Sequence, residues 1–457
     1  MSAQQHKDQS DTESTKEPAQ DLLERAKAVL DINDEGDFTI PAEGLYPHQW
    51  LWDSCFIAIG LRNYDVARAQ KELVSLLRGQ WANGMLPHMI FAPGDQHRRD
   101  RNIWRSQLSP FAPDNVATSG ITQPPLLAEA VVRIGEKLKL TERRTWYQTM
   151  FPALLAYHNW LYTDRDPHNE GLILQIHPYE TGLDNTPPWI NQLRMHHPPW
   201  WASLIDFLHL EWFISLFRRD TKHVPPGERM SNIEALIYYD VILRLRRKQY
   251  NTDMILNRSM FAVEDLTFNC IVVRANHCLK SISKTIKQEI PDELQARMDQ
   301  SEKALDQLWD GYSGQYFSRN FVSHKLIKED SIATLMPLYA GTVTMERAEQ
   351  LVKLLHDKHR FGALYPVPTV PLNSPWFNAH GYWQGPTWLN TNWLIIDGLR
   401  RYGYHQEADI IARKSIELVE KAGCYEYFSP IDGSPAGAPN FSWTAALTID
   451  LLKSPAA

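Results

Sequence analysis

The segment H-G-Y-W-Q-G-P-T-W-L-N-T-N-W at residues 380–393 joins an aromatic loop to the start of a helix. Its two glycines and one proline favour an irregular backbone in the first half. Apolar residues then continue at helical spacing to about residue 402. We expect Tyr382 and Trp383 to form the wall of a pocket, with Gln384 reaching toward hydroxyl groups of a ligand. Trp388 suits either this wall or the core, and Trp393 suits the core.

This succession of an aromatic loop and a helix recurs along the chain. Aromatic loops at residues 45–54 and 81–91 each lead into apolar or helical segments. One helix face is marked by the apolar residues Val66, Ala69, Leu73 and Leu76. Thr344 is predicted to cap a helix that follows it. Helical periodicity predicts further helices at residues 21–30, 126–140, 144–161, 203–217, 232–248, 262–286, 291–309, 330–339, 388–402, 405–421 and 443–452.

About fourteen helices with little strand predict an all-α protein. Short turns on one side and long aromatic loops on the other favour a closed double ring of helices, an (α/α)6 toroid with its functional loops on one face. An α-solenoid or a two-domain bundle has the same periodicity, so both stay open as alternatives. No linker interrupts residues 20–457, which predicts a single catalytic domain. Residues 1–19 are polar and acidic, and we expect a disordered tail there.

The composition excludes several classes of function. With 457 residues, of which 43% are hydrophobic, the chain can bury a large core. A net charge of −7 provides no basic surface for nucleic acid or for a membrane. The apolar runs are too short for a membrane span. Four cysteines without a C-x-x-C pair, together with an N-terminus that lacks an apolar signal region, predict reduced thiols and a cytoplasmic location.

The aromatic residues are the unusual feature of the composition. The chain has 16 tryptophans and 18 tyrosines, and many of them lie in polar loops with Gly, Pro, Asn and His. A flat ring can stack on the C–H face of a sugar while polar neighbours bind its hydroxyl groups. These loops therefore favour a carbohydrate-binding site.

Two loop carboxylates are the leading catalytic candidates. Asp184 lies in H-P-Y-E-T-G-L-D-N-T-P at residues 177–187, and Glu426 lies in Y-E-Y-F-S-P at residues 425–430. Hydrolysis of a glycoside with inversion needs a protonated carboxyl and a carboxylate that activates water, about 6.5–9.5 Å apart. Locally, Asp184 also suits a simple turn and Glu426 a solvated loop.

Seven motifs in a fixed order give this pair its context. They are W-L-W-D-S (50–54), N-G-M-L-P-H-M (83–89), S-G-I-T-Q-P-P (119–125), E-T-G-L-D-N-T (180–186), Y-W-Q-G-P-T-W (382–388), E-Y-F (426–428) and F-S-W-T-A (441–445). Together they resemble glycoside hydrolase family 63, and most of all its compact bacterial enzymes that act on mannosylglycerate and glucosylglycerate. The resemblance implies an (α/α)6 barrel and an inverting mechanism without a metal or other cofactor.

The resemblance also implies roles for individual residues. Asp184 would be the general acid and Glu426 the general base. The sugar subsite would be lined by Tyr46, Trp50, Trp52, Asp53, His88, Gln123, Trp383, Gly385 and Trp388. The residue types agree with this, because an ionised Asp53 accepts strong hydrogen bonds and His88 and Gln123 can donate and accept. Trp50 and Trp52 would share one face if their segment is extended.

The residues that depart from the family pattern bear on which group the substrate carries beside its sugar. Asn440 stands where relatives often carry Gln. Arg229 fits a position where relatives place an arginine near glycerate, and it could bind a carboxylate with its two-pronged guanidinium. The matching tyrosine is Ala235 here, although Tyr238 and Tyr239 follow. The arginine-rich segment at residues 96–105 suits a solvated loop, with a lid over an anionic ligand as the alternative.

We therefore predict an inverting α-glycoside hydrolase that cleaves glucosylglycerate or mannosylglycerate. A hydrolase of a neutral disaccharide such as trehalose and a sugar-binding toroid without catalysis are the alternatives. An epimerase would need catalytic histidines, for which only His88 and His380 are candidates. The expected partner is a small glycoside, with no nucleic acid, membrane or metal, and a homo-oligomer stays open.

Overall fold

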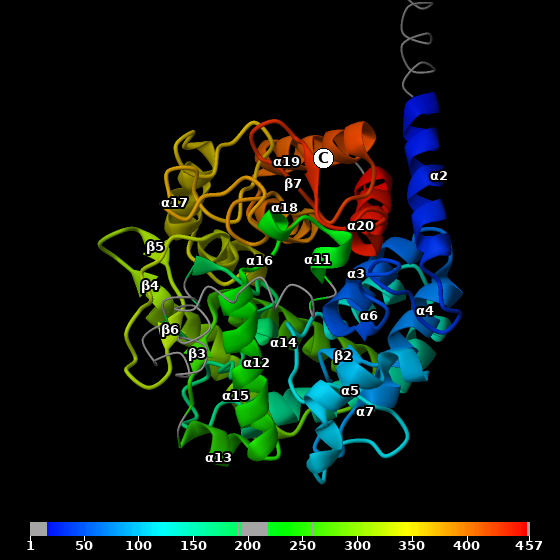
Figure 1. Cartoon of the computed structure of the whole chain (residues 1–457), viewed down its shortest axis with the longest axis vertical. Helices are drawn as coiled ribbons and strands as arrows, with labels where there is room; N and C mark the ends of the chain where they lie inside the picture. The colour runs from blue at the N-terminus through cyan, green and yellow to red at the C-terminus, as the bar shows by residue number, and fades with distance from the viewer. Residues whose placement is uncertain are drawn as a thin grey trace, which may run out of the picture.

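Six helices form a closed inner ring in the computed structural model, which describes residues 16–187, 189, 192, 193, 218, 220–257 and 259–454. Each helix of the ring packs against the next, and the last packs back against the first. Figure 1 shows these helices around the centre of the molecule. In chain order they are α3 (Leu51–Leu61), α6 (Leu127–Glu136), α14 (Leu266–Ile286), α16 (Pro337–Ala340), α18 (Leu389–Arg401) and α20 (Ser442–Lys453).

Outer helices alternate with the inner ones along the chain. α2 packs on α20, α4 on α3 and α6, α7 on α6 and α14, α15 on α14, and α19 on α18 and α20, while α17 lies at the periphery in Figure 1. The prediction of an (α/α)6 toroid is thereby confirmed. The outer helices are α2 (Lys16–Ile32), α4 (Val66–Leu76), α7 (Leu140–Asp164), α15 (Asp292–Ala304), α17 (Met345–His356) and α19 (His405–Ala422).

The extent of burial distinguishes the inner helix α3 from the outer helix α4. All eleven residues of α3 are buried, as expected for a helix that is surrounded on every side. The outer helix α4 instead buries one face, on which Ala69, Leu73 and Leu76 lie as predicted, whereas Val66 at its first turn is half-buried. The apolar pattern of each helix therefore matches its layer.

Further helices and four short strand pairs lie between the ring helices in the sequence. The further helices are α5 (Arg98–Trp104), α11 (Asp220–His223), α12 (Asn232–Arg247) and α13 (Thr252–Leu256). Four two-stranded antiparallel ladders pair β1 (Gln49–Trp50) with β2 (Met89–Ile90), β3 (Val263–Glu264) with β6 (Arg319–Asn320), β4 (Trp309–Asp310) with β5 (Gln315–Tyr316), and β7 (Tyr427–Phe428) with β8 (Pro435–Ala436).

Several predicted boundaries differ from the structure. The predicted loop at residues 45–54 ends earlier, because α3 already begins at Leu51. The helix predicted from residue 262 starts at Leu266, where the Asp265 carboxylate accepts a hydrogen bond from the Phe268 amide at 2.7 Å. Thr344 caps α17 as predicted. The predicted helix at 203–217 and most of the expected tail at 1–19 lie outside the described residues, and α2 begins at Lys16.

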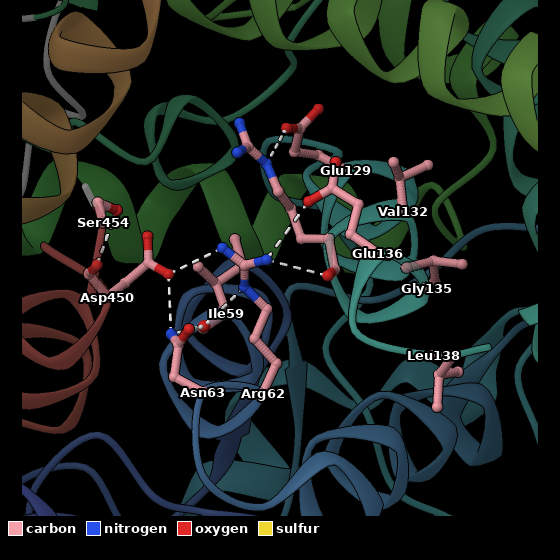
Figure 2. A network of polar contacts seen from close by, with 12 residues as sticks. Ile59, Arg62, Asn63, Glu129, Val132, Gly135, Glu136, Leu138, Asp450 and Ser454 are labelled. Atoms are coloured by element: carbon pink, nitrogen blue, oxygen red, sulfur yellow. Dashed lines mark hydrogen bonds and ion pairs between the residues drawn. The ribbon is translucent and has the colours of Figure 1, made fainter. Parts of the chain in front are cut away.

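The end of the ring opposite the loops is held by buried charges. Arg62, just after α3, donates to Asp450 Oδ1 of α20 at 2.8 Å. It also donates to the Arg133 carbonyl of α6 at 3.0 Å and to Glu136 at 3.4 Å. Figure 2 shows Arg62 between α6 and α20, with Asn63 on the same Asp450 oxygen. One arginine thus joins three inner helices.

Glu129 on α6 extends this network around the ring. Its carboxylate accepts from Arg133 Nε at 2.7 Å and pairs with Arg274 Nε of α14 at 2.9 Å. Arg133 also pairs with Asp397 of α18. Burial alone would raise the pKa of Glu129, but the charges of Arg133 and Arg274 lower it to about 2. Its negative charge is therefore maintained at neutral pH.

Replacing Glu129 by alanine should destabilise the toroid strongly, because two largely buried arginines would lose their shared partner. We expect the free energy of unfolding to fall by about 3–5 kcal/mol, measured by chemical denaturation. The matched control is Glu136→Ala, since the Glu136 side chain is 53% exposed and should contribute about 1 kcal/mol or less. Equal losses in both variants would contradict this account.

Two further predictions concern membrane-spanning helices and the state of the cysteines. None of the described helices is long and apolar enough to cross a membrane. All four cysteines are free of disulfide bonds and buried.

Candidate active site

A cavity of about 410 Å³ opens where the N-terminal ends of inner helices meet the aromatic loops. This volume lies in the usual range for small-molecule sites. The cavity gathers residues from segments far apart in the sequence. The predicted site residues in its wall are Tyr46, Trp50, Trp52, Asp53, His88, Gln123, Asp184, Arg229, Tyr382, Trp383 and Glu426.

The Asp184 loop is fastened on both sides. The hydroxyl of Tyr238 donates to the Asp184 carbonyl. Next to it, Asn185 Oδ1 accepts from the Trp383 amide at 2.9 Å. Gly182, two residues before Asp184, has a φ of 77°, and a Cβ there would lie 2.7 Å from the Trp52 ring. Glycine is therefore required for the loop to approach the pocket this closely.

The environment of Asp184 favours its protonated form. Burial raises the pKa of Asp184 to about 7, and the negative charge of Glu426 adds to the rise. A hydrogen bond from the Tyr382 hydroxyl to Oδ2, at 3.0 Å, and the charge of Arg229 oppose it. Asp184 can thus deliver a proton near neutral pH.

The carboxylate of Glu426 is surrounded by hydrogen-bond donors. Oε1 accepts from the Tyr46 hydroxyl at 2.9 Å and from Arg229 Nη1 at 3.0 Å. Oε2 accepts from the Ala438 amide at 3.0 Å. Gly437 has a φ of 74°, and a Cβ there would lie 2.6 Å from Oε2. A buried carboxylate with a cation and two other donors is stabilised as the anion.

Arg229 contacts Glu426 and two tyrosine rings of the pocket wall. Its guanidinium carbon is 5.4 Å from the centre of the Tyr46 ring and 4.9 Å from that of Tyr382. Nη2 donates to the Tyr46 hydroxyl at 2.6 Å. The arginine predicted to bind a substrate carboxylate is therefore in the pocket wall and already paired with Glu426.

Polar groups and rings form the inner end of the pocket. Burial raises the pKa of Asp53 well above its usual range, with the charges of Glu426 and Asp184 adding to the effect. Burial lowers the pKa of His88 well below its usual range, so its ring is neutral. Trp50 ends strand β1, whereas Trp52 and Asp53 lie in the first turn of α3, so the extended segment considered for Trp50 and Trp52 does not reach Trp52. The helix still brings Trp52 and Asp53 to the pocket wall.

Three predicted substrate contacts lie outside the pocket wall. Trp388 is fully buried behind Trp383, with the two rings stacked 3.8 Å apart. The Gly385 amide donates to Thr369, and Gly385 shapes the turn instead of facing the cavity. Asn440 is exposed, and its carbonyl accepts a hydrogen bond from Asn33. Trp388 and Gly385 thus belong to the scaffold of the wall, whereas Asn440 lies at the surface.

The histidine pair that an epimerase would need is not assembled. His88 lines the pocket, but His380 bonds Ser434 and lies outside the wall. Ala235 stands where relatives carry a tyrosine, but another tyrosine of the same helix reaches the pocket. Ala235 and Tyr239, one turn later on α12, both line the pocket, whereas Tyr238 holds the Asp184 loop.

The arginine-rich segment at residues 96–105 differs most from the prediction. The expected solvated loop is instead the helix α5, and it forms part of the pocket wall. Asp100, Ile103 and Trp104 line the cavity from it. Their spacing of three and four residues is helical, so this signal was available in the sequence.

A cluster beside the pocket entrance has the composition of a metal site. His48, His97 and Asp100 place possible ligand atoms within 4.8 Å of one another. However, the Ala92 amide donates to His48 Nδ1 at 3.2 Å. His48 Nε2 must then carry the ring proton, which it shares with Asp100 at 3.1 Å. This nitrogen is therefore a hydrogen-bond donor in this arrangement and not a metal ligand.

Comparisons with known proteins agree with this geometry. The family model for the mannosylglycerate hydrolase MGH1-like glycoside hydrolase domain matches residues 46–444. A mannosylglycerate hydrolase from Thermus thermophilus is 38% identical over 435 residues, which cover 93% of this chain and 99% of that protein. A glucosylglycerate hydrolase from Mycolicibacterium hassiacum is 30% identical over 448 residues, covering 94% and 97% of the two chains.

A solved structure is equally similar. The crystal structure of a GH63 mannosylglycerate hydrolase from Thermus thermophilus, in complex with Tris and D-glycerate, matches with a TM-score of 0.84. The sequences are 37% identical, and the match covers 94% of this chain and 99% of that one. The chain therefore belongs to the MGH1-like branch of glycoside hydrolase family 63, and it is a glycoside hydrolase.

Proposed function

We propose that this hydrolase cleaves an α-glycoside of glycerate, carrying a mannosyl or glucosyl ring, with inversion at the anomeric carbon. The observation that carries the proposal is the contrast between the surroundings of Asp184 and Glu426 in the pocket wall. Burial raises the pKa of Asp184 to about 7, whereas Glu426 accepts hydrogen bonds from Arg229 and Tyr46. A carboxyl that can hold a proton near neutral pH and a carboxylate surrounded by donors suit an acid and a base. The activities named for the relatives support glycerate as the leaving group.

The reaction then needs only groups of this chain and one water molecule. The Asp184 proton passes to the glycosidic oxygen as the bond from the anomeric carbon to that oxygen breaks. Glu426 takes a proton from the water, whose oxygen forms the new bond on the opposite face of the ring. Asp53, His88 and Gln123 orient the sugar hydroxyl groups. The products are the free sugar and glycerate.

Arg229 is proposed to contact the glycerate group as well. A guanidinium has five N–H donors, and Glu426 and Tyr46 each accept from one of them. Its buried Nε–H has no partner among the described residues. The remaining donors are available to a carboxylate beside Glu426.

A substrate panel tests this function. The purified protein would be incubated with mannosylglycerate, glucosylglycerate and trehalose, and released sugar would be measured. We expect turnover of at least one glycerate glycoside with a kcat/KM far above that for trehalose. Faster hydrolysis of trehalose would contradict the proposal and support the neutral-disaccharide alternative. The cytoplasmic location and any homo-oligomer stay predictions from the sequence.

The protonation of Asp184 predicts how activity depends on pH. A carboxyl whose pKa is raised to about 7 is protonated below that pH and loses its proton above it. Since the general acid must be protonated, we expect kcat to fall as pH rises through about 7. The hydrogen bond from Tyr382 lowers the pKa of Asp184. Tyr382→Phe should therefore move this decline to higher pH, by about one unit.

The matched control is Tyr179→Phe. Tyr179 also lines the pocket, but its hydroxyl contacts Met230 Sδ at 4.0 Å and not Asp184. Its pH profile of kcat should keep the wild-type position. A decline that stays in place in Tyr382→Phe would contradict the assigned hydrogen bond.

A further inference from the structure

Among the described residues, three arginines line the pocket, and they differ in their partners. Arg218 pairs with Asp220, and Arg229 pairs with Glu426. Arg99 is exposed at the pocket and makes no ion pair or hydrogen bond through its side chain with any described residue. Its charge is thus available to a ligand.

The helix that carries Arg99 is held firmly at both ends. Near its start, Asp100 bonds His48 at 3.1 Å. Near its end, Arg246 of α12 donates to the Ile103 carbonyl at 2.9 Å, and the Tyr250 hydroxyl donates to the Trp104 carbonyl. These bonds fix the backbone of α5, so Arg99 is presented at a defined place on the pocket rim.

The lining carboxylates leave the side chain of Arg99 without a direct partner. Asp220 and Glu426 pair with the other two arginines, and Asp100 is hydrogen-bonded to His48. Burial raises the pKa values of Asp53 and Asp184, which favours their neutral forms. Among the described lining residues, none of these carboxylates forms an ion pair with Arg99. The guanidinium of Arg99 can therefore pair directly with an anionic ligand.

We propose that Arg99 binds the carboxylate of the leaving group and so selects anionic over neutral glycosides. The proposal rests on the function proposed above, and it adds a second arginine whose charge is not shared with the general base. A guanidinium can hold a carboxylate by two parallel hydrogen bonds. Arg229 divides its donors between Glu426, Tyr46 and the proposed glycerate contact, whereas the whole guanidinium of Arg99 is available to the carboxylate.

The test compares two substrates in three variants. One substrate is a glycerate glycoside that the wild type hydrolyses, and the other is the same glycoside of glycerol, which has CH2OH in place of the carboxylate. For Arg99→Ala we expect KM for the glycerate glycoside to rise about tenfold with kcat changed less than about twofold. Both constants for the glycerol glycoside should stay unchanged. Arg99→Lys should recover most of the affinity, because it keeps the charge.

Arg98→Ala is the matched control. Arg98 is the neighbouring exposed arginine of the same helix and does not line the pocket. We expect wild-type constants for both substrates. An unchanged KM for the glycerate glycoside in Arg99→Ala would overturn the inference, as would equal losses on both substrates. If the wild type cleaves no glycerate glycoside, the proposed function itself fails, and the inference fails with it.

Discussion

Asp184→Asn is expected to lower kcat on a glycerate glycoside by about 1,000-fold, within the range that a general acid contributes. Asparagine has nearly the size of aspartate, and its amide oxygen can still accept from Tyr382. The variant loses only the proton that the leaving glycerate oxygen requires. Steady-state kinetics with the purified variant measure the loss, and thermal unfolding should show a fold as stable as the wild type.

An α-glycosyl fluoride with the same sugar provides the control. Fluoride departs with little need for a proton, so Asp184→Asn should retain much more of its activity on this substrate. Glu426 is still required there, because water must still be activated. Near-wild-type rates of Asp184→Asn on the glycerate glycoside would contradict the role of Asp184.

Glu426→Gln should cause the second large loss, of about 1,000-fold in kcat, on the fluoride as well as on the natural substrate. Glutamine cannot accept the proton of the attacking water. The change also removes the anion that neutralises Arg229, whose side chain is 3% exposed. Breaking a buried ion pair costs about 3–5 kcal/mol. We therefore expect a lower unfolding temperature, and activity must be measured well below it.

A small anion separates the chemical role of Glu426 from its structural one. Glu426→Ala leaves a space beside Arg229 and Tyr46, in which formate can occupy the place of the carboxylate. We expect added formate to restore part of the activity of Glu426→Ala and none of that of Asp184→Asn. Restoration of both variants to the same extent would contradict the assignment of the base.

The sequence predicted the architecture because the architecture is periodic. Helical spacing of apolar residues marks most inner and outer helices, and the aromatic loops between them mark the active face. The start of α3 was missed for a physical reason. Trp52 and Asp53 belong to its first turn but also face the pocket, so their residue types resemble a loop. For α5, charged residues concealed the helical spacing of Ile103 and Trp104.

The residues of the candidate site could be predicted from the sequence, but the contacts between those residues could not. The ordered motifs pointed to Asp184 and Glu426, although each is separately compatible with an ordinary turn. The Arg229–Glu426 pair joins residues 197 positions apart, and periodicity does not report such a contact. Trp388 and Trp383 share a motif, yet only the fold decides that Trp388 stacks behind and Trp383 faces the cavity.

The configuration of the sugar at the moment of release tests the central claim most directly. Proton NMR during the first minutes of hydrolysis distinguishes the anomers before they interconvert. An acid at Asp184 and a base at Glu426 on opposite faces of the ring predict that an α-glycoside releases the β-sugar first. Release of the α-sugar first would contradict inversion and, with it, the role of Glu426 as the base that activates water.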